Sequence, residues 1–186
     1  MKKISLVLIT IASTLFANAQ DHNAEMKAWM DYMTPGSIHQ KMAKDVGEWK
    51  AEVTTWMDPS QPPEKSQATV RNEMAYGGRY LITKYTGTMM GMPFEGMGTM
   101  GYDNATKMFN STWVDNMGTG ISYMQGKWKE EGKIIELHGE SPDPVTGKMY
   151  KLREVMIFND DNHQTMEMYA NKDGKEVKMM EMRLSR

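Results

Sequence analysis

The chain has 186 residues, 22 methionines, no cysteine and a formal net charge of −2, with 22 basic against 24 acidic side chains. Charges of both signs are interspersed along it, which excludes a basic surface for nucleic acid or anionic lipid. The absence of cysteine excludes disulfide links and a lipid-modified N-terminal cysteine, but the chain is long enough to bury one core without them.

Residues 1–19 are predicted to be an export signal. Lys2 and Lys3 precede a short apolar run over residues 4–16, and Ala17-Asn18-Ala19 supplies the small-x-small pattern of a signal-peptidase site. The run is too short to span a bilayer comfortably, and no stop-transfer pattern follows. We therefore expect cleavage before Gln20, a periplasmic or secreted protein, and no transmembrane segment after cleavage.

Residues 20–46 are predicted to form a short helical segment. Apolar residues between positions 24 and 33 are spaced as on an amphipathic helix, which Thr34-Pro35-Gly36 would end. Ser37 is a candidate N-cap for a second short helix that would run to Gly47. One or two short helices are thus expected before the main domain.

Residues 47–186 have the pattern of an all-β domain. Trp49, Ala51 and Val53 alternate with charged residues, which predicts a half-buried strand. Turn-forming Gly, Asn, Asp and Pro residues separate nine further expected strands, over residues 67–76, 79–89, 94–102, 108–115, 121–129, 133–139, 150–158, 164–170 and 176–184. About ten sequential antiparallel strands with short connections favour an up-and-down barrel, because closure removes open edges. A β-sandwich is the alternative.

The methionines admit two interpretations. Met166 with Met168, and Met180 with Met182, alternate along their strands, as expected of flexible side chains that line a core or a cavity. Thioethers also select Cu(I), and the Met89-Met90-x-Met92 cluster superficially resembles such a site. The histidines do not lie beside these clusters in sequence, so core or cavity lining is favoured and no metal or other cofactor is expected.

No catalytic constellation stands out. The chain has no Gly-x-Ser-x-Gly turn and no His-Glu-x-x-His motif. His22 and His39 fall outside the expected β-domain, and three or four converging zinc ligands cannot be assembled. The sequence therefore favours a non-enzymatic protein and identifies no catalytic residue.

Charged residues within apolar strands are better clues to a site. Glu154 shares a strand face with Leu152 and Met156, and Arg153 precedes it. One hypothesis places Arg153, Glu154, Glu181 and Arg183 in a polar anchor inside the barrel, since a buried charge must be paired or bound. The favoured alternative is a set of cross-strand ion pairs on the outer surface.

Several aromatic and polar residues are candidates for a ligand cavity, which is typically apolar with a few oriented polar groups. Trp113 and Trp128 are equally interpretable as ordinary core residues. The segment from residue 113 to 120 is the candidate rim. The complete set of candidate ligand-binding residues is Met92, Tyr102, Trp113, Asp115, Asn116, Trp128, Arg153 and Glu154.

Ordered motifs from about His39 to the C-terminus resemble the bacterial domain-of-unknown-function 1579 family. They are Gly47-Glu48-Trp49, Gly78-Arg79-Tyr80-Leu81, the segments at residues 89–96 and 101–104, Trp113-Val114-Asp115-Asn116-Met117-Gly118-Thr119, and Asp143-Pro144-x-Thr146-Gly147-Lys148. The resemblance implies a barrel of the lipocalin or calycin kind and carries over no catalytic residue, because the family has no assigned activity.

Three functional hypotheses follow from the sequence. The first is an exported, non-enzymatic, lipocalin-like barrel that binds a small apolar molecule. The second is a structural or protein-interaction module that exposes its Met- and Gly-rich turns. The third is a periplasmic Cu(I)-binding protein. The sequence predicts no particular oligomeric state.

Overall fold

The computed structural model describes residues 22–56, 61–172 and 174–186, with the backbone alone at Lys172. The expected signal peptide, residues 1–19, lies outside this part of the chain. Residues 22–33 form a helix in a unit that ends at Thr34, and Pro35–Arg186 form a second, compact unit. Within the described ranges, no helix has both the length and the apolar character needed to cross a membrane.

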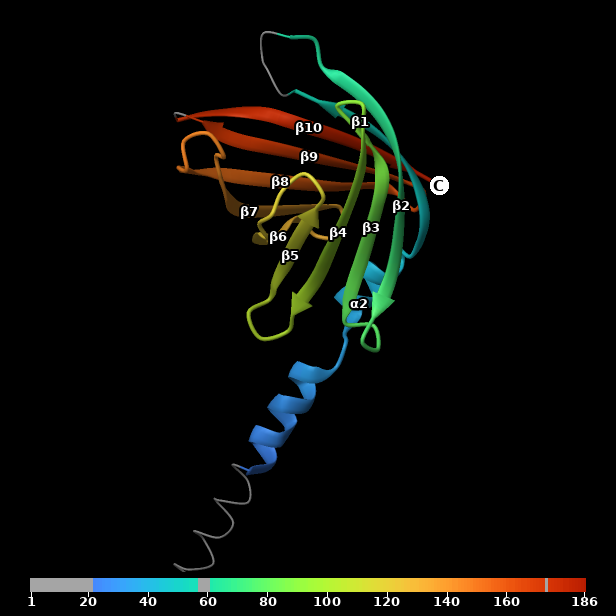
Figure 1. Ribbon diagram of the computed structural model, residues 1–186. Coiled ribbons are helices and arrows are strands. Elements are labelled where there is room, and N and C mark those ends of the chain that lie inside the picture. The colour runs from blue at the N-terminus through green and yellow to red at the C-terminus, as the bar shows by residue number, and fades with distance from the viewer. Residues whose placement is uncertain (1–21, 57–60, 173) are drawn as a thin grey trace, which may run out of the picture. The chain divides into compact units, whose positions relative to one another are not determined.

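The second unit consists of one short helix, α2, and ten strands (Figure 1). Their number and order confirm the predicted all-β domain. The bounds are α2 Ser37–Ala43, β1 Gly47–Thr55, β2 Glu64–Ala75, β3 Tyr80–Met89, β4 Met92–Asp103, β5 Met108–Asp115, β6 Ser122–Glu130, β7 Ile134–Pro142, β8 Met149–Asp160, β9 His163–Lys172 and β10 Lys175–Ser185.

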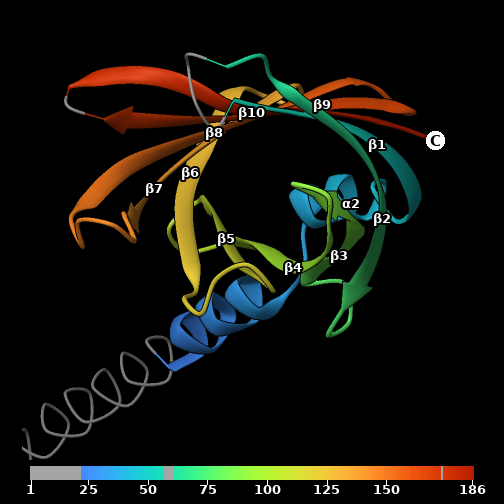
Figure 2. The ribbon, with the colours of Figure 1, turned by 45° about the horizontal axis from the view of Figure 1, so that its top comes forward.

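The ten strands form a closed antiparallel barrel. Each strand pairs with its neighbours in sequence, and β1 pairs with β10 from Lys50↔Ser185 to Thr55↔Met180. Figure 2 shows the strands arranged in a ring. The up-and-down barrel is therefore confirmed and the sandwich alternative is wrong, because the short connections leave no crossover between two sheets.

Helix α2 packs on one end of the barrel, next to β3 and β4. It begins after Gly36, whose backbone N–H donates to Nδ1 of His39 at 3.0 Å, and it buries His39 and Met42. Ser37 is the first helical residue and not the N-cap. The helix stops at Ala43, short of the predicted end at Gly47, because Gly47 already begins β1.

Two apolar clusters fill parts of the barrel interior. The cluster nearest α2 is built around the fully buried Phe109, Ile135 and Leu137. The other is built around Trp49 of β1 and includes Tyr85 and Phe94. These packed regions bound a space that remains open inside the barrel.

Candidate ligand-binding site

The barrel encloses a cavity of about 340 Å³. Every strand except β7 contributes to its wall, and so does Asp45 in the connection between α2 and β1. Most of the lining is apolar, as in typical small-molecule sites. Its methionines are Met89, Met100, Met117, Met124, Met156, Met166, Met168, Met180 and Met182.

A block of methionines on β8, β9 and β10 forms one wall of this cavity, as the alternation in sequence predicted. Met156, Met166 and Met182 are cross-strand partners in one row, and Glu154, Met168 and Met180 are partners in the next. Cross-strand partners have Cβ atoms about 4.5–5.5 Å apart. Six adjacent inward positions thus carry five thioethers and a single carboxyl group.

Glu154 is the carboxyl group within this wall. Its neighbours across the ladder are Leu137 and Met168, and no described residue forms a hydrogen bond or an ion pair with it. Burial raises the pKa of Glu154 to about 7, and its residual exposed surface faces the cavity. Near neutral pH the group can therefore accept from a cationic or hydroxyl donor, or, when protonated, donate to a carbonyl.

A second polar group closes the cavity on the α2 side. The side-chain amide of Gln164 donates to Oδ1 of Asp45 at 2.7 Å, and burial raises the pKa of Asp45 to about 6. The backbone oxygen of Asp45 accepts from Trp49 Nε1 at 2.9 Å and from Asn72 Nδ2 at 3.1 Å. This pair could not be predicted from the sequence, because Asp45 and Gln164 lie 119 positions apart and no motif connects them.

Trp113 and Asp115, two of the candidate residues, line the cavity. The indole N–H of Trp113 donates to Oδ2 of Asp115 at 2.7 Å. Oδ1 of Asp115 accepts from the backbone N–H groups of Met117 and Gly118, which shapes the turn after β5. The Trp113 ring stacks near Phe94 with centroids 6.5 Å apart, so this corner of the cavity is aromatic.

Four other candidate residues do not line this cavity. Met92 is 47 % exposed at the start of β4 and is not part of the cavity lining. Tyr102 packs edge-on against Phe109 with centroids 5.0 Å apart, as part of the core beside α2. Asn116 is exposed, and its side chain forms hydrogen bonds with the backbone of Pro93 and Glu95 in β4. Trp128 lines a different pocket, beneath α2.

The placement of Arg153 inside the barrel is corrected, because its neighbour Glu154 takes the inner face and successive residues of a strand alternate. Arg153 donates to Glu176 at 2.7 Å and to Glu136 at 3.3 Å, and its guanidinium lies 4.1 Å from the centre of the Tyr169 ring. Glu181 likewise pairs with Lys178 and Arg183. The outer-surface interpretation thus holds for Arg153, Glu181 and Arg183, while Glu154 alone faces the cavity.

Among the described residues, no group of three or more His, Asp or Glu side chains is arranged to hold a metal ion. The polar groups that could bind a ligand in the cavity are therefore single side chains, not a cluster. Its two carboxyl groups with raised pKa values are Glu154 in the methionine wall and Asp45 at the α2 side.

The described chain is thus a closed antiparallel, lipocalin-like β-barrel with a largely apolar interior cavity and a few polar groups. Residues 34–186 match the family described as "Protein of unknown function (DUF1579)", and the chain belongs to that family. No functionally curated protein matches it.

Two solved structures share the fold. Rv2717c from M. tuberculosis is 16 % identical with a TM-score of 0.60, over 82 % of this chain and 99 % of that one. The S-type phycobiliprotein lyase CPES from Guillardia theta is 10 % identical with a TM-score of 0.56, over 84 % and 95 % of the two chains. At such identities the likeness concerns the fold alone.

Proposed function

We propose that this protein binds a small, largely apolar molecule non-covalently inside the barrel, with Glu154 as its polar anchor. The observation that carries the proposal is an unpaired carboxyl group in a methionine-lined cavity. Burying such a group without a partner is unfavourable, and a ligand that bears a hydrogen-bonding or cationic group would supply the partner.

The cavity also defines the class of ligand. A volume of about 340 Å³ suits a compact molecule of the size that small-molecule sites usually hold. Thioether sulfurs make favourable contacts with aromatic ring edges, so an aromatic or conjugated body fits the wall formed by β8, β9 and β10. The shared fold with a phycobiliprotein lyase is in keeping with a barrel that handles small molecules, although that support is by analogy.

Native mass spectrometry of the protein purified from its source organism tests the proposal. We expect one organic adduct per chain on the wild type and less of it on Glu154→Gln. A copper adduct in place of an organic one would support the Cu(I) hypothesis instead, since the methionine wall is also a soft-ligand surface.

Titration with the neutral apolar dye Nile red provides a second test. Ser111→Phe projects a ring into the cavity and should abolish binding, whereas Thr69→Phe adds the same ring on the exposed outer face of β2 and should not. Equal dye binding by both variants, together with no adduct on the wild type, would rule out an interior site.

A second candidate function is protein interaction through the barrel end opposite α2. Met90, Met92 and Met117 are exposed there. Asn116 fixes the connection after β5 to the start of β4 by donating to the backbone oxygen of Pro93 at 3.1 Å and accepting from the backbone N–H of Glu95 at 3.1 Å. If this surface binds a partner, replacing Met90 and Met92, which do not line the cavity, by serine should abolish co-purification of that partner and leave Nile red binding unchanged.

We also propose that the protein is exported, on the basis of its first 19 residues. Intact mass measurement of the chain from its source organism tests this proposal. A chain that begins at Gln20 is expected, and a full-length chain that retains Met1 would contradict it.

A further inference from the structure

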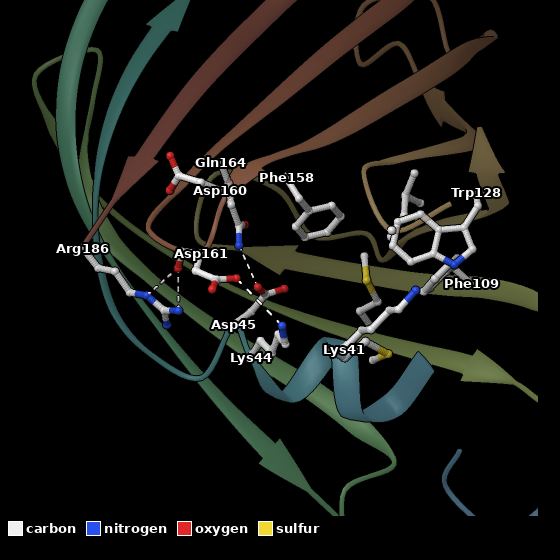
Figure 3. Close-up of a pocket in the computed structure, with 14 residues that line it drawn as sticks. Lys41, Lys44, Asp45, Phe109, Trp128, Phe158, Asp160, Asp161, Gln164 and Arg186 are labelled. Carbon is white, nitrogen blue, oxygen red and sulfur yellow. Dashed lines mark hydrogen bonds and ion pairs between the residues drawn. The ribbon is translucent and has the colours of Figure 1, made fainter. Parts of the chain in front are cut away.

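A second pocket, of about 230 Å³, lies between α2 and the adjacent end of the barrel (Figure 3). Asp45 and Gln164 line both this pocket and the main cavity, so their hydrogen bond stands between the two spaces. We propose that the pocket is a separate binding site for a small carboxylate with an apolar, planar body. This inference does not depend on the ligand proposed for the main cavity.

Two hydrogen-bond donors mark one side of the pocket. The indole Nε1 of Trp128 is buried, and no acceptor among the described residues lies within hydrogen-bonding distance of it. Nζ of Lys41 is 5.7 Å from the centre of the Trp128 ring, and Figure 3 shows both nitrogens on the same side of the pocket. Both groups only donate, which fits an acceptor that carries negative charge.

Lys41 is available to such an acceptor. Its nearest carboxylate is that of Glu131, with 3.6 Å between Lys41 Nζ and Glu131 Oε1. The Glu131 side chain is 78 % exposed, so this ion pair is weak and screened by solvent. Lys41 also lies in the last turn of α2, close to Gly132 in the turn between β6 and β7. A bound carboxylate can therefore replace Glu131 as the partner of Lys41 without leaving a buried charge unpaired.

An aromatic wall adjoins these donors. The Trp128 ring meets Phe109 edge-on with centroids 5.2 Å apart, and Phe158 is 5.9 Å away at a tilt. Ile135, almost fully buried, lies beside them in the lining. A planar apolar body can pack on this wall while its carboxylate reaches Trp128 and Lys41.

The acidic residues of the pocket do not compete for this role, because Asp45 and Asp160 have close partners and the Asp161 side chain is 83 % exposed to solvent. Asp160 contacts His163 at 3.0 Å, and Asp161 pairs with Lys44 at 3.9 Å. Asp45 accepts from Gln164, as described above. Arg186 donates to the backbone oxygens of Asp161 and Val46, so its cationic group is also occupied. One side of the pocket thus carries the aspartates, and the other carries the hydrogen-bond donors Trp128 Nε1 and Lys41 Nζ, which are available to a ligand.

The indole N–H signals in a ¹H–¹⁵N NMR spectrum of the full chain test this proposal directly. The Trp128 signal is assigned by its loss in Trp128→Phe. We expect benzoate to shift this signal more than any other indole signal, and benzylamine, its cationic counterpart, to leave it in place. Lys41→Met should weaken benzoate binding at least tenfold, while Lys44→Met, on the same helix, should change it less than twofold.

The outcomes separate this site from the main cavity. Glu154→Gln should leave benzoate binding unchanged, and Lys41→Arg, which keeps the charge, should retain it. A Trp128 signal that does not respond to benzoate would overturn the proposal. So would equal binding of benzylamine, undiminished binding by a folded Lys41→Met, or loss of binding in Glu154→Gln.

Discussion

Two adjacent residues, Arg153 and Glu154, show how strand alternation divides polar groups between the two faces of the barrel. Arg153 points out and joins an ion-pair network on the outer face, in which its guanidinium makes two hydrogen bonds to Glu176. Glu154 points in and has no partner among the described residues. Sequence reasoning identified Glu154 because it interrupts an apolar face, but it did not separate it from Arg153, because both charges stand in one strand.

The raised pKa of Glu154 makes the stability of the fold depend on pH. The folded-state pKa is about 7, above the ordinary value of 4.5, so the folded state binds more protons between these limits. The free energy of unfolding should therefore fall as the pH rises through this window. Glu154→Gln stays neutral, so its stability relative to the wild type should increase by up to about 3 kcal/mol between pH 4.5 and pH 8.

Urea unfolding of the two proteins across this pH range measures the difference. The pKa of Asp45 is also raised, but Asp45 contributes equally to the pH dependence of the free energy of unfolding in both proteins, so its contribution cancels in the difference. Parallel pH profiles for the wild type and Glu154→Gln would show that the carboxyl group is better solvated than its burial indicates.

At the scale of elements, the bounds of the Gly-rich strand β4 could be predicted from its sequence pattern, but the packing of a ring on its glycines could not. The strand bounds were predicted closely, because turn residues separate runs of alternating polarity. The role of Gly96 and Gly98 was not predicted, since the ring that covers them belongs to β5. Trp113 is the cross-strand partner of Gly98, and its ring lies over both glycines.

Gly96→Ala should destabilise the barrel by about 1–3 kcal/mol, because overpacking forces side chains from their places. A Cβ atom at Gly96 would come within 2.3 Å of Cζ2 of Trp113. Chemical denaturation followed by far-UV circular dichroism measures the loss. Gly120→Ala is the matched control, since a Cβ atom there meets nothing within 4 Å and the change should be close to neutral.

At the barrel end opposite α2, Asn116 joins the connection after β5 to the start of β4. Asn116 was predicted from the sequence to lie in a ligand site. Its side-chain amide donates to the backbone oxygen of Pro93 and accepts from the backbone N–H of Glu95, as the backbone of a neighbouring strand would. Asn116→Ala removes both bonds at an exposed site, where each contributes about 0.5–1.5 kcal/mol. Hydrogen exchange at the Glu95 amide should accelerate at least fivefold, and unchanged exchange would show that the backbone alone holds the loops.

At the scale of the whole molecule, closure of the barrel joins the two ends of the domain. The β1–β10 pair is the single pairing between strands distant in sequence, and its formation carries the largest loop-closure cost. The sequence predicted this closure in principle, because ten open strands would leave two exposed edges. The residues that secure the seam could not be predicted, since they act through contacts between segments far apart in sequence.

Arg186 secures the seam at the α2 end. Its guanidinium lies 4.3 Å from the centre of the Trp49 ring in β1, and it donates to backbone oxygens of Val46, before β1, and of Asp161, in the turn between β8 and β9. Arg186→Ala removes these contacts from three segments. We expect the free energy of unfolding to fall by about 1–2 kcal/mol, because the hydrogen bonds and the cation–π contact are lost together.

Arg183→Ala is the matched control within β10. The Arg183 side chain is 71 % exposed and pairs only with the neighbouring Glu181 in the described structure, so its loss should change stability by less than about 0.5 kcal/mol. Urea unfolding at pH 7 followed by tryptophan fluorescence compares the two variants. Equal effects of the two substitutions would show that the β1–β10 ladder itself stabilises the seam. A larger effect of Arg186→Ala would show that the Arg186 side chain stabilises the closed barrel at its α2 end.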